Sequence, residues 1–541
     1  MTLKGPMHQL MLVVVSVVVV FALHNATFWG IWAEIFYGSI ARGIVFAVAF
    51  FLLCCGLMSI FAFNRLLRPT IAILLILSAV TSFYMDQLGV VIDREMIQNV
   101  VSTTITEGKH LITAPFVIWV GLTGLLPAVL VFYIQISHRN FVTAIWQNML
   151  TLLLCVFGFV GLIATDLKGN ASVLRTRIDL KSSFQPLAPI AEYFRYVAMI
   201  SRSVTLEFNE IGLDAALLED FNLSGKPNLT VVVVGETARA QNFSLGSYDR
   251  LTNPELAKKD IAYFDNVSSC GTSTAVSLPC MFSKFNRSEY SYERGKSHEN
   301  VLDLIQRAGY RVEWIDNNTG DKGLAERVVY SHVTNVDDPT FCGEGECIDG
   351  ILVAEVARRL AGIQSDTVLV LHQIGSHGPS YYLRYPQAFE KFQPACRTSN
   401  FSDCTTQELT NAYDNTILYT DKVMADLLSL LAKQKSLITS MIYVSDHGES
   451  LGEKGLYLHG APYFMAPDEQ TKVPMIIWLS DAYQRVTGTN LECLTAEPDL
   501  DYSHANLFHT LLGMTGVQTA QRDPQLDIFD NCRKKPNGGK P

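Results

Sequence analysis

Two apolar runs in the sequence each end in side chains that can bind a metal ion. The runs and the residues after them are 229–234 with Glu236, and 441–444 with Asp446, His447 and Glu449. In α/β proteins, functional groups gather at the carboxyl ends of buried parallel strands. Carboxylate and imidazole groups are typical zinc ligands. If both runs are strands of one sheet, the sequence predicts a zinc site at its edge.

A hydroxyl-rich segment, residues 269–280, is a second source of chemistry. It carries Thr272, Ser273 and Thr274 just ahead of a short apolar stretch, so that one of these hydroxyls could stand at a helix N-terminus. Unpaired N–H groups and the helix dipole favour an anion and a nucleophilic oxygen there. Hydroxyls at helix starts are more commonly caps. The residues alone therefore leave both roles open and do not choose among the three side chains.

Strand-like and helix-like patterns alternate from residue 228 onward, which predicts an α/β sheet with helices on both faces. The expected strands are 230–234, 312–315, 367–372, 441–444 and 475–479, and the expected helices are 301–308, 350–363 and 409–431. One domain, residues 227–532, would then hold the predicted site. The tail at 533–541 is rich in Lys, Gly and Pro and is expected to be disordered.

The N-terminal part is too apolar for a soluble domain. Of 541 residues, 49% are hydrophobic and 17% are charged, and the apolar excess lies before residue 165. Five runs approach the ~20 residues that a membrane-spanning helix needs: 10–23, 43–63, 70–84, 112–136 and 144–164. The first could be a signal peptide, but no small-residue cleavage site follows it, so we expect a five-helix transmembrane domain at 1–165. The net charge of -10 argues against a nucleic-acid partner.

Charges in the short loops predict the orientation of the spans. Lys4, Arg65, Arg68 and Arg139 alternate with an acidic loop, and basic loops stay in the cytoplasm. Three basic residues lie against this bias: Arg42, Arg94 and Lys109. Five spans then place everything after residue 165 outside the cytoplasm. Residues 166–226 are expected to hold one or two amphipathic helices along the membrane surface, although a solvated connector fits the same pattern.

The cysteines test this topology independently. Cys54, Cys55 and Cys155 lie in expected spans, and the other eight all follow residue 269. An even number, mostly in close pairs, indicates disulfides in an oxidising compartment. The expected pairs are Cys270 with Cys280, Cys342 with Cys347, Cys396 with Cys404, and Cys493 with Cys532. A structural zinc cluster is the alternative, but the spacings lack repeated C-x-x-C knuckles.

Four motifs occur in an order that resembles one protein family. They are Gly235-Glu-Thr-Ala-Arg239, Ser269-Cys-Gly-Thr-Ser-Thr-Ala-Val-Ser-Leu-Pro-Cys-Met-Phe282, Gly375-Ser-His-Gly-Pro379, and Ser445-Asp-His-Gly-Glu-Ser-Leu-Gly452 followed by His459-Gly460. The chain, including its membrane part, resembles the bacterial phosphoethanolamine transferases that modify lipid A, a family that includes the mobile colistin-resistance enzymes. The resemblance implies an alkaline-phosphatase-like (sulfatase-like) α/β fold for the outer domain.

The resemblance also implies roles for side chains. One tightly bound zinc would be held by Glu236, Asp446, His447 and the hydroxyl of Thr274, which the family pattern selects as the nucleophile. Coordination lowers the pKa of a hydroxyl that is otherwise a poor nucleophile. The residues that match the family's phosphoryl site are His377, His459, Lys322, Asn318 and Glu449, with a second, weaker zinc near the two histidines. Each of these side chains has an ordinary turn or surface role as its alternative. The histidines outside this set, such as His298 and His332, are expected to be solvated.

A further polar group lies upstream, in the expected external loop. Asn99, Thr103 and Glu107 are four residues apart and would share one face of a helix. Such a face is usually the wet side of an interfacial helix. In the resembling family these positions are associated with the phosphoethanolamine headgroup, whose ammonium Glu107 could meet.

Together these inferences predict a multi-pass enzyme of a Gram-negative inner membrane, monomeric, with its catalytic domain in the periplasm. As the resemblance implies, Thr274 would take phosphoethanolamine from phosphatidylethanolamine and pass it to a lipid A phosphate through a covalent phosphoethanolamine-threonine intermediate. The added amine would weaken the binding of cationic polymyxins. Alternatives are transfer of phosphoethanolamine or phosphoglycerol to another envelope glycan, hydrolysis, or a non-catalytic membrane sensor. The sequence lacks a sulfatase C-x-P-x-R or S-x-P-x-R motif at the nucleophile position, and it retains Glu236, Asp446 and His447.

Overall fold

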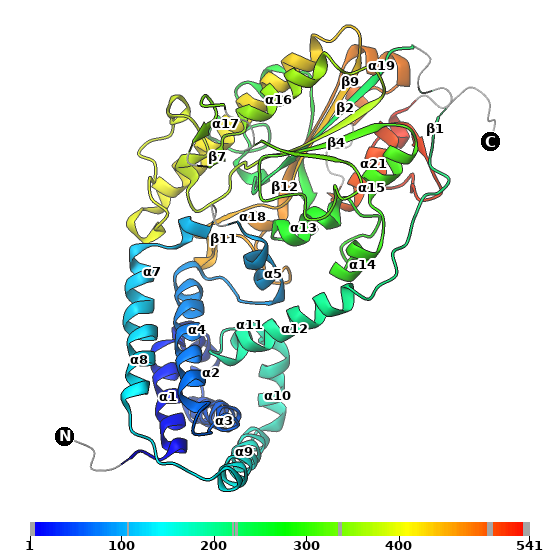
Figure 1. Cartoon of the computed structure of the whole chain (residues 1–541). Helices are drawn as coiled ribbons and strands as arrows, with labels where there is room; N and C mark the ends of the chain where they lie inside the picture. The colour runs from blue at the N-terminus through cyan, green and yellow to red at the C-terminus, as the bar shows by residue number, and fades with distance from the viewer. Residues whose placement is uncertain are drawn as a thin grey trace. The chain divides into compact units, whose positions relative to one another are not determined.

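The structure is a computed structural model that describes residues 6–104, 108–218, 221, 225–333, 338–343, 345–494 and 501–533 (Figure 1). It forms two compact units. The first comprises residues 1–97 and 112–196, and the second comprises residues 98–111 and 197–541. Of the residues named in the sequence predictions, Lys4, Glu107 and all of the tail except Arg533 lie outside the described residues.

The first unit consists of helices that are long and apolar enough to cross a membrane. Four such stretches occur among the described residues: α3 (Ile40–Ser59), α4 (Leu67–Leu88), Ala114–Tyr133 and α9 (Phe141–Ala164). The third combines α7 (Ala114–Trp119), η2 (Val120–Leu125) and α8 (Leu126–Tyr133). A fifth span arises if α1 (Gln9–Leu23) and α2 (Ala26–Phe36), which are bent by 74° at a short break, count as one. Large apolar side chains such as Leu154 and Phe157 are exposed on α9, as expected for a surface that faces lipid.

Three helices follow α9 in the region predicted to hold amphipathic helices. They are α10 (Leu167–Thr176), α11 (Ile178–Ser182) and α12 (Leu187–Ser203). In α12, Tyr193 and Phe194 are exposed. Exposed aromatic residues on a helix that also carries charged residues are typical of segments lying in a membrane interface.

The second unit is built on an eight-stranded sheet with the order β13-β3-β12-β9-β2-β8-β4-β5. The strands are β2 (Asn228–Gly235), β3 (Ala262–Ser268), β4 (Arg311–Asp316), β5 (Val329–His332), β8 (Thr367–His372), β9 (Ile438–Ser445), β12 (Lys472–Leu479) and β13 (Tyr502–Ser503). The five strands from β9 to β5 in this order are parallel, whereas β12 runs antiparallel to β9 and β3. Every strand expected from the sequence is present.

Helices cover both faces of the sheet, as the sequence predicts (Figure 1). α16 (Gly350–Leu360) and α17 (Thr406–Ala432) lie over one face, and α13 (Thr274–Met281), α15 (Val301–Arg307) and α21 (Ala505–Met514) lie over the other. All residues of β2 and β9 are buried, which is typical of central parallel strands between two helical layers. The residues at the carboxyl ends of these two strands are therefore buried inside the unit.

Four disulfides cross-link the second unit. They join Cys270 to Cys280, Cys342 to Cys347, Cys396 to Cys404, and Cys493 to Cys532, which are the four pairs expected from the spacing. The first of them ties the segment just before the hydroxyl triplet to the end of α13. This disulfide therefore restricts the movement of the segment that leads into α13.

Candidate active site

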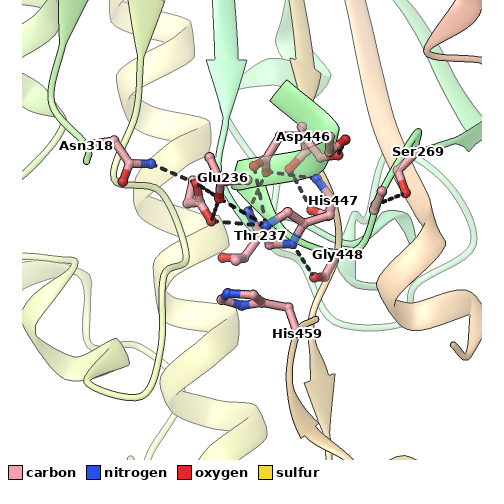
Figure 2. A network of polar contacts seen from close by, with 12 residues as sticks. Glu236, Thr237, Ser269, Asn318, Asp446, His447, Gly448 and His459 are labelled. Atoms are coloured by element: carbon pink, nitrogen blue, oxygen red, sulfur yellow. Dashed lines mark hydrogen bonds and ion pairs between the residues drawn. The ribbon is translucent and has the colours of Figure 1, made fainter. Parts of the chain in front are cut away.

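β2 and β9 bring the predicted ligands together. Their parallel register pairs Gly235 with Ser445, so the next residues, Glu236 and Asp446, leave the sheet side by side. These two side chains and His447 are fully buried. Figure 2 shows them converging beyond the strand ends. The structure thus places the three predicted zinc ligands in one cluster.

The distances within the cluster suit a small cation. One ligand atom from each of Glu236, Asp446 and His447 lies within 4.8 Å of the others. The Oγ1 atom of Thr274 is 3.1 Å from Oε2 of Glu236 and 3.2 Å from Nε2 of His447. Nε2 of His447 is also 3.3 Å from Oδ2 of Asp446. Four potential ligands therefore surround one point.

The geometry distinguishes the three hydroxyls that the sequence could not rank. The hydroxyl of Thr272 donates to the carbonyl of Ala461 over 2.6 Å. Ser273 is the N-cap residue of α13 but forms no capping bond with its side chain. Thr274 is the first residue of the helix, and of the three described hydroxyls it is the one that reaches the ligands. Its oxygen lies where the N-terminal N–H groups favour negative charge.

Backbone contacts fix the orientation of the ligands. Nδ1 of His447 is 2.9 Å from the carbonyl of Gly448, so the hydrogen sits on Nδ1 and Nε2 keeps its lone pair for the cluster. Oδ1 of Asp446 accepts the N–H groups of His447 and Thr237, at 2.8 and 3.3 Å. Thr237 reaches this position with a φ of 52°, a conformation that costs a β-branched residue energy and that marks many functional sites.

The cluster contains more hydrogen-bond acceptors than donors. Burial raises the pKa of Asp446 and lowers the pKa of His447 well below its usual value. Among the described residues, no donor makes a well-formed hydrogen bond to Oδ2 of the buried Asp446, and the nearby Thr274 hydroxyl only partly offsets the rise in the pKa of this carboxyl. Two carboxylates and a neutral imidazole converge here, and their oxygens are not all satisfied by hydrogen bonds. Together they are a set of ligands for a divalent cation, and zinc binds this combination of ligands. The residues present therefore fit the predicted metal.

His504 braces the two segments that carry the site. Its N–H group on Nε2 faces the carbonyl of Ser445 at 2.9 Å, and Nδ1 accepts the N–H of Cys270 at 3.0 Å. Burial lowers the pKa of His504 to about 4, so the ring is neutral and can accept and donate at once. The end of β9 is thereby joined to the loop before Thr274. No sequence pattern indicates this role, because the residues around His504 form no recognisable motif.

A second group of predicted residues lies beside the cluster. The ring of His459 is 4.5 Å from the ring of His447 and 5.5 Å from that of His377, measured between centroids. Nδ1 of His459 is 2.8 Å from Oε2 of Glu449. Tyr381, which was not predicted, donates its hydroxyl to Oε1 of Glu449 over 2.6 Å. Glu449 therefore orients His459 and is itself held in place.

The loop after β4 carries two further predicted residues. Asn318 is buried, and its amide nitrogen lies 2.7 Å from Oε2 of Glu236 (Figure 2). Lys322 is on the same loop, and its Nζ atom donates to the carbonyl and the hydroxyl of Thr319 at 2.8 and 2.7 Å. His332, which was expected to be solvated, is partly buried: its side chain is 27% exposed and its Nε2 lies 3.0 Å from the carbonyl of Asn318. β5 pairs with β4 and carries this ring to the loop.

The upstream segment belongs in part to the second unit. α5 (Arg94–Ser102) contains Asn99, and the Thr103 hydroxyl bonds to the Asn99 carbonyl over 2.8 Å. The neighbouring Gln98 donates its amide to the carbonyl of Ala275 over 3.1 Å. This contact places the segment next to the residue that follows Thr274. Glu107 lies outside the described residues.

The second unit has the sulfatase fold. The family model described as Sulfatase matches residues 228–517, the region that contains the sheet and the cluster. The sulfatase-like, alkaline-phosphatase-like α/β class predicted for this region is confirmed. A second family model, described as phosphoethanolamine transferase EptA/EptB, matches residues 49–199.

Whole-chain similarities narrow this class to one family. The chain is 41% identical over 479 residues to the phosphoethanolamine transferase EptA of Escherichia coli K12, covering 87% of each chain. It is 37% identical over 429 residues to the phosphatidylethanolamine transferase Mcr-1 of Escherichia coli, covering 77% of this chain and 79% of that one. The solved integral membrane lipooligosaccharide phosphoethanolamine transferase A of Neisseria meningitidis superposes with a TM-score of 0.94 at 32% identity, covering 98% of this chain and 100% of that chain. The chain belongs to the phosphoethanolamine transferase family.

Proposed function

We propose that this protein transfers phosphoethanolamine from phosphatidylethanolamine to a phosphate of lipid A, with Thr274 as the nucleophile. The observation that carries the proposal is the position of the Thr274 hydroxyl, 3.1 Å from Glu236 and 3.2 Å from Nε2 of His447, in a chain that belongs to this family. A hydroxyl held among metal ligands at a helix N-terminus can attack a phosphodiester.

The transfer takes place in two displacements at one phosphorus atom. In the first, Oγ1 of Thr274 gives up its proton and forms a bond to phosphorus, the bond from phosphorus to the diacylglycerol oxygen breaks, and that oxygen takes up a proton. In the second, a phosphate oxygen of lipid A attacks the same phosphorus, and the bond to Thr274 breaks. The threonine oxygen then regains its proton. Two such steps invert the phosphorus twice and leave the same site ready for the next donor.

Glu236, Asp446, His447 and Thr274 would hold one zinc ion. When bound, zinc supplies positive charge that lowers the pKa of the threonine hydroxyl and offsets the charge that grows on the phosphoryl oxygens. A second, weaker zinc near His377 and His459 is part of the proposal.

The other side chains move protons and hold the substrate. Because the Glu449 carboxylate accepts the hydrogen on Nδ1 of His459, the other ring nitrogen keeps a lone pair that can take up a proton, and the resulting imidazolium can give that proton to the departing diacylglycerol oxygen. Lys322 and His377 stabilise the phosphoryl charge. Asn99, Thr103 and Glu107 would bind the ethanolamine headgroup, with Glu107 against the ammonium. Gln98 supports this arrangement, because it anchors the segment to Ala275.

The proposal includes a location for the enzyme. Four disulfides favour an oxidising compartment, and the basic loops of the membrane unit favour a cytoplasmic side opposite to it. We place the enzyme as a monomer in the inner membrane with the second unit in the periplasm. α12 would lie along the membrane surface, where lipid donors and acceptors are reached without leaving the bilayer.

Mass spectrometry of lipid A tests the proposal. Cells without a transferase of their own would express the parent chain, Thr274→Ala or Thr272→Ala. The parent and Thr272→Ala are expected to add phosphoethanolamine to lipid A, and Thr274→Ala is expected to add none. Thr272→Ala is the matched control, since it removes a hydroxyl two residues away that bonds to the Ala461 carbonyl. Unmodified lipid A with the parent, or modification by Thr274→Ala, would refute the proposal.

A further inference from the structure

We infer that Asp316 and His372 form a buried relay that positions Asn318 against the predicted metal ligand Glu236. The inference rests on the proposed function of the site and adds two positioning residues to it. Neither residue is among the side chains predicted from the sequence. Asp316, His372 and Glu236 are each 0% exposed.

Three neighbouring strands deliver the relay to one edge of the sheet. β4 and β8 are parallel, and their register pairs Asp316, the last residue of β4, with His372, the last residue of β8. β8 in turn pairs with β2, where His372 lies opposite Val234, two residues before Glu236. The carboxyl ends of parallel strands meet at one edge, so these side chains are adjacent although they are far apart in sequence.

The hydrogen bonds of Asp316 define it as an ionised acceptor. Oδ2 accepts the indole N–H of Trp314 at 2.8 Å, and Oδ1 accepts the backbone N–H groups of Asn318 and Gly320 at 2.8 and 3.2 Å. Burial opposes ionisation, but the contacts with His372 and these donors hold the pKa of Asp316 at about 2. The carboxylate therefore fixes the loop that carries Asn318.

The charge of Asp316 determines the tautomer of His372. Nδ1 of His372 lies 3.0 Å from Oδ2 of Asp316, so Nδ1 carries the hydrogen and Nε2 is an acceptor. Nε2 faces the amide nitrogen of Asn318 at 3.2 Å. The same nitrogen lies 2.8 Å from the carbonyl of Gln373 and 2.7 Å from Oε2 of Glu236. An amide oxygen could not face three acceptors, so this atom is the NH2 group and the amide cannot turn over; its two hydrogens are shared among the three acceptors, and the contact with Nε2 of His372 is the longest.

The relay thus acts on a metal ligand. Its chain of donors and acceptors runs from Asp316 through His372 and Asn318 to Oε2 of Glu236. Because both amide hydrogens of Asn318 are shared among these acceptors, its part in the site is to orient Glu236 and not to bind substrate directly. Partners of metal ligands that fix orientation in this way commonly contribute about 10- to 100-fold to metal affinity.

Zinc affinity of the full-length protein in detergent micelles tests the relay. Protein stripped of metal would be titrated with zinc in competition with a chromophoric chelator, and its thermal unfolding without zinc would be recorded in parallel. Asp316→Asn and His372→Leu are expected to weaken zinc binding about 10- to 100-fold, because the first reverses the tautomer of His372 and the second removes the acceptor for Asn318. His372→Gln keeps an acceptor facing Asn318 and is expected to stay within about threefold of the parent.

Asp421→Asn is the matched control for the loss of a buried carboxylate. Asp421 accepts the N–H groups of Glu255 and Leu256, at 2.9 and 2.8 Å, and takes no part in the relay. Unchanged zinc affinity in Asp316→Asn and His372→Leu, or an equal loss in Asp421→Asn, would overturn the inference. An equal loss in His372→Gln and His372→Leu would do the same, even if Asp316→Asn fails to fold. If the parent transfers no phosphoethanolamine, the proposed function fails, whatever the zinc affinities show.

Discussion

Each unit of the molecule holds a cluster of polar side chains, fully buried at the sheet edge and half-buried around Arg139, and the clusters differ in how their donors and acceptors balance. In the membrane unit, Arg139 donates to Gln9 Oε1 at 2.6 Å, Gln147 Oε1 at 2.8 Å, Asn148 Oδ1 at 3.1 Å and the carbonyl of Ala62 at 2.5 Å. Among the described residues, each buried side-chain polar atom of Arg139, Gln9, Gln147 and Asn148 has a partner. This cluster is complete without a ligand.

The cluster at the edge of the sheet is not complete in the same way. Glu236, Asp446 and His447 supply mostly acceptors, and in the part of the chain that the structure describes Oδ2 of Asp446 accepts no well-formed hydrogen bond. A buried acceptor without a donor destabilises a protein unless a cation satisfies it. The difference teaches that a buried polar network is evidence of a binding site only when its donors and acceptors do not balance.

The largest expected effect is that a substitution of Asp446 weakens zinc binding but stabilises the metal-free protein. Asp446→Asn should lower zinc affinity by on the order of 10³-fold, because it removes a charged ligand. In metal-free protein the same change should raise the melting temperature, since it removes a buried carboxylate with one oxygen that lacks a well-formed hydrogen bond. Thermal unfolding of parent and variant, each with zinc and with a chelator, measures both effects. Destabilisation of the variant in both conditions would show that the cluster is balanced without a cation.

The next effect is the loss of the charge at the centre of the membrane cluster. Arg139→Leu leaves the acceptors of Gln9, Gln147 and Asn148 without their donor, and we expect it to destabilise the membrane unit by about 2–5 kcal/mol. Zinc should change this loss by little, because the cluster offers no cation site. Unfolding in detergent with and without zinc measures it. A loss that zinc largely reverses would contradict the contrast between the two clusters.

The sequence predicted the ligand cluster because its members follow unbroken apolar runs. β2 and β9 consist of buried, largely β-branched or apolar residues, and Glu236 and Asp446 come directly after them. The disulfide pairs were equally accessible, since three of the four join cysteines at most 10 residues apart. Patterns within a short window of sequence thus carried both predictions.

What the sequence could not predict depends on pairing between distant strands. Asp316 and His372 are 56 residues apart and meet through the register of β4 and β8. His504 contacts the carbonyl of Ser445 across 59 residues, and no local pattern distinguishes it from a surface histidine. Thr274 could be chosen from its triplet only by resemblance, because the direction of each hydroxyl follows from the start of α13. Side chains that position other side chains leave no periodic signal of their own.

Lowering the pH should destabilise the second unit more than the cluster around Arg139, because the second unit contains buried histidines. Burial lowers the pKa of both His504 and His509 to about 4, below the ordinary value near 6.5. The unfolded chain therefore binds more protons between pH 6.5 and 4, and the second unit should lose up to about 1.4 kcal/mol per pH unit for each histidine as the pH falls. The guanidinium of Arg139 keeps its charge over this range and gives no such slope.

The variant His509→Asn isolates this effect. Asparagine can still accept the N–H of Asp523, which Nδ1 of His509 accepts over 2.9 Å, but it does not titrate. Asp421, whose pKa burial raises to about 6, opposes the histidines over part of the range, so the test is the difference between parent and variant. Unfolding free energies from pH 7 to 4 should fall less steeply in the variant. Parallel curves would contradict the buried, neutral state of His509.

The smallest effect is expected at the margin of the membrane cluster. Asn64 is only partly buried; it donates its amide to the carbonyl of Arg139 over 2.9 Å, and its Oδ1 accepts from the Gln9 side chain and from the backbone N–H of Arg139. Asn64→Ala should cost about 0.5–1.5 kcal/mol, since water can replace a neutral hydrogen bond at a half-exposed site. Zinc affinity should not change. A loss of stability as large as that of Arg139→Leu would mean that every partner in the Arg139 cluster is required for its stability. The central charge would then not be the dominant contribution.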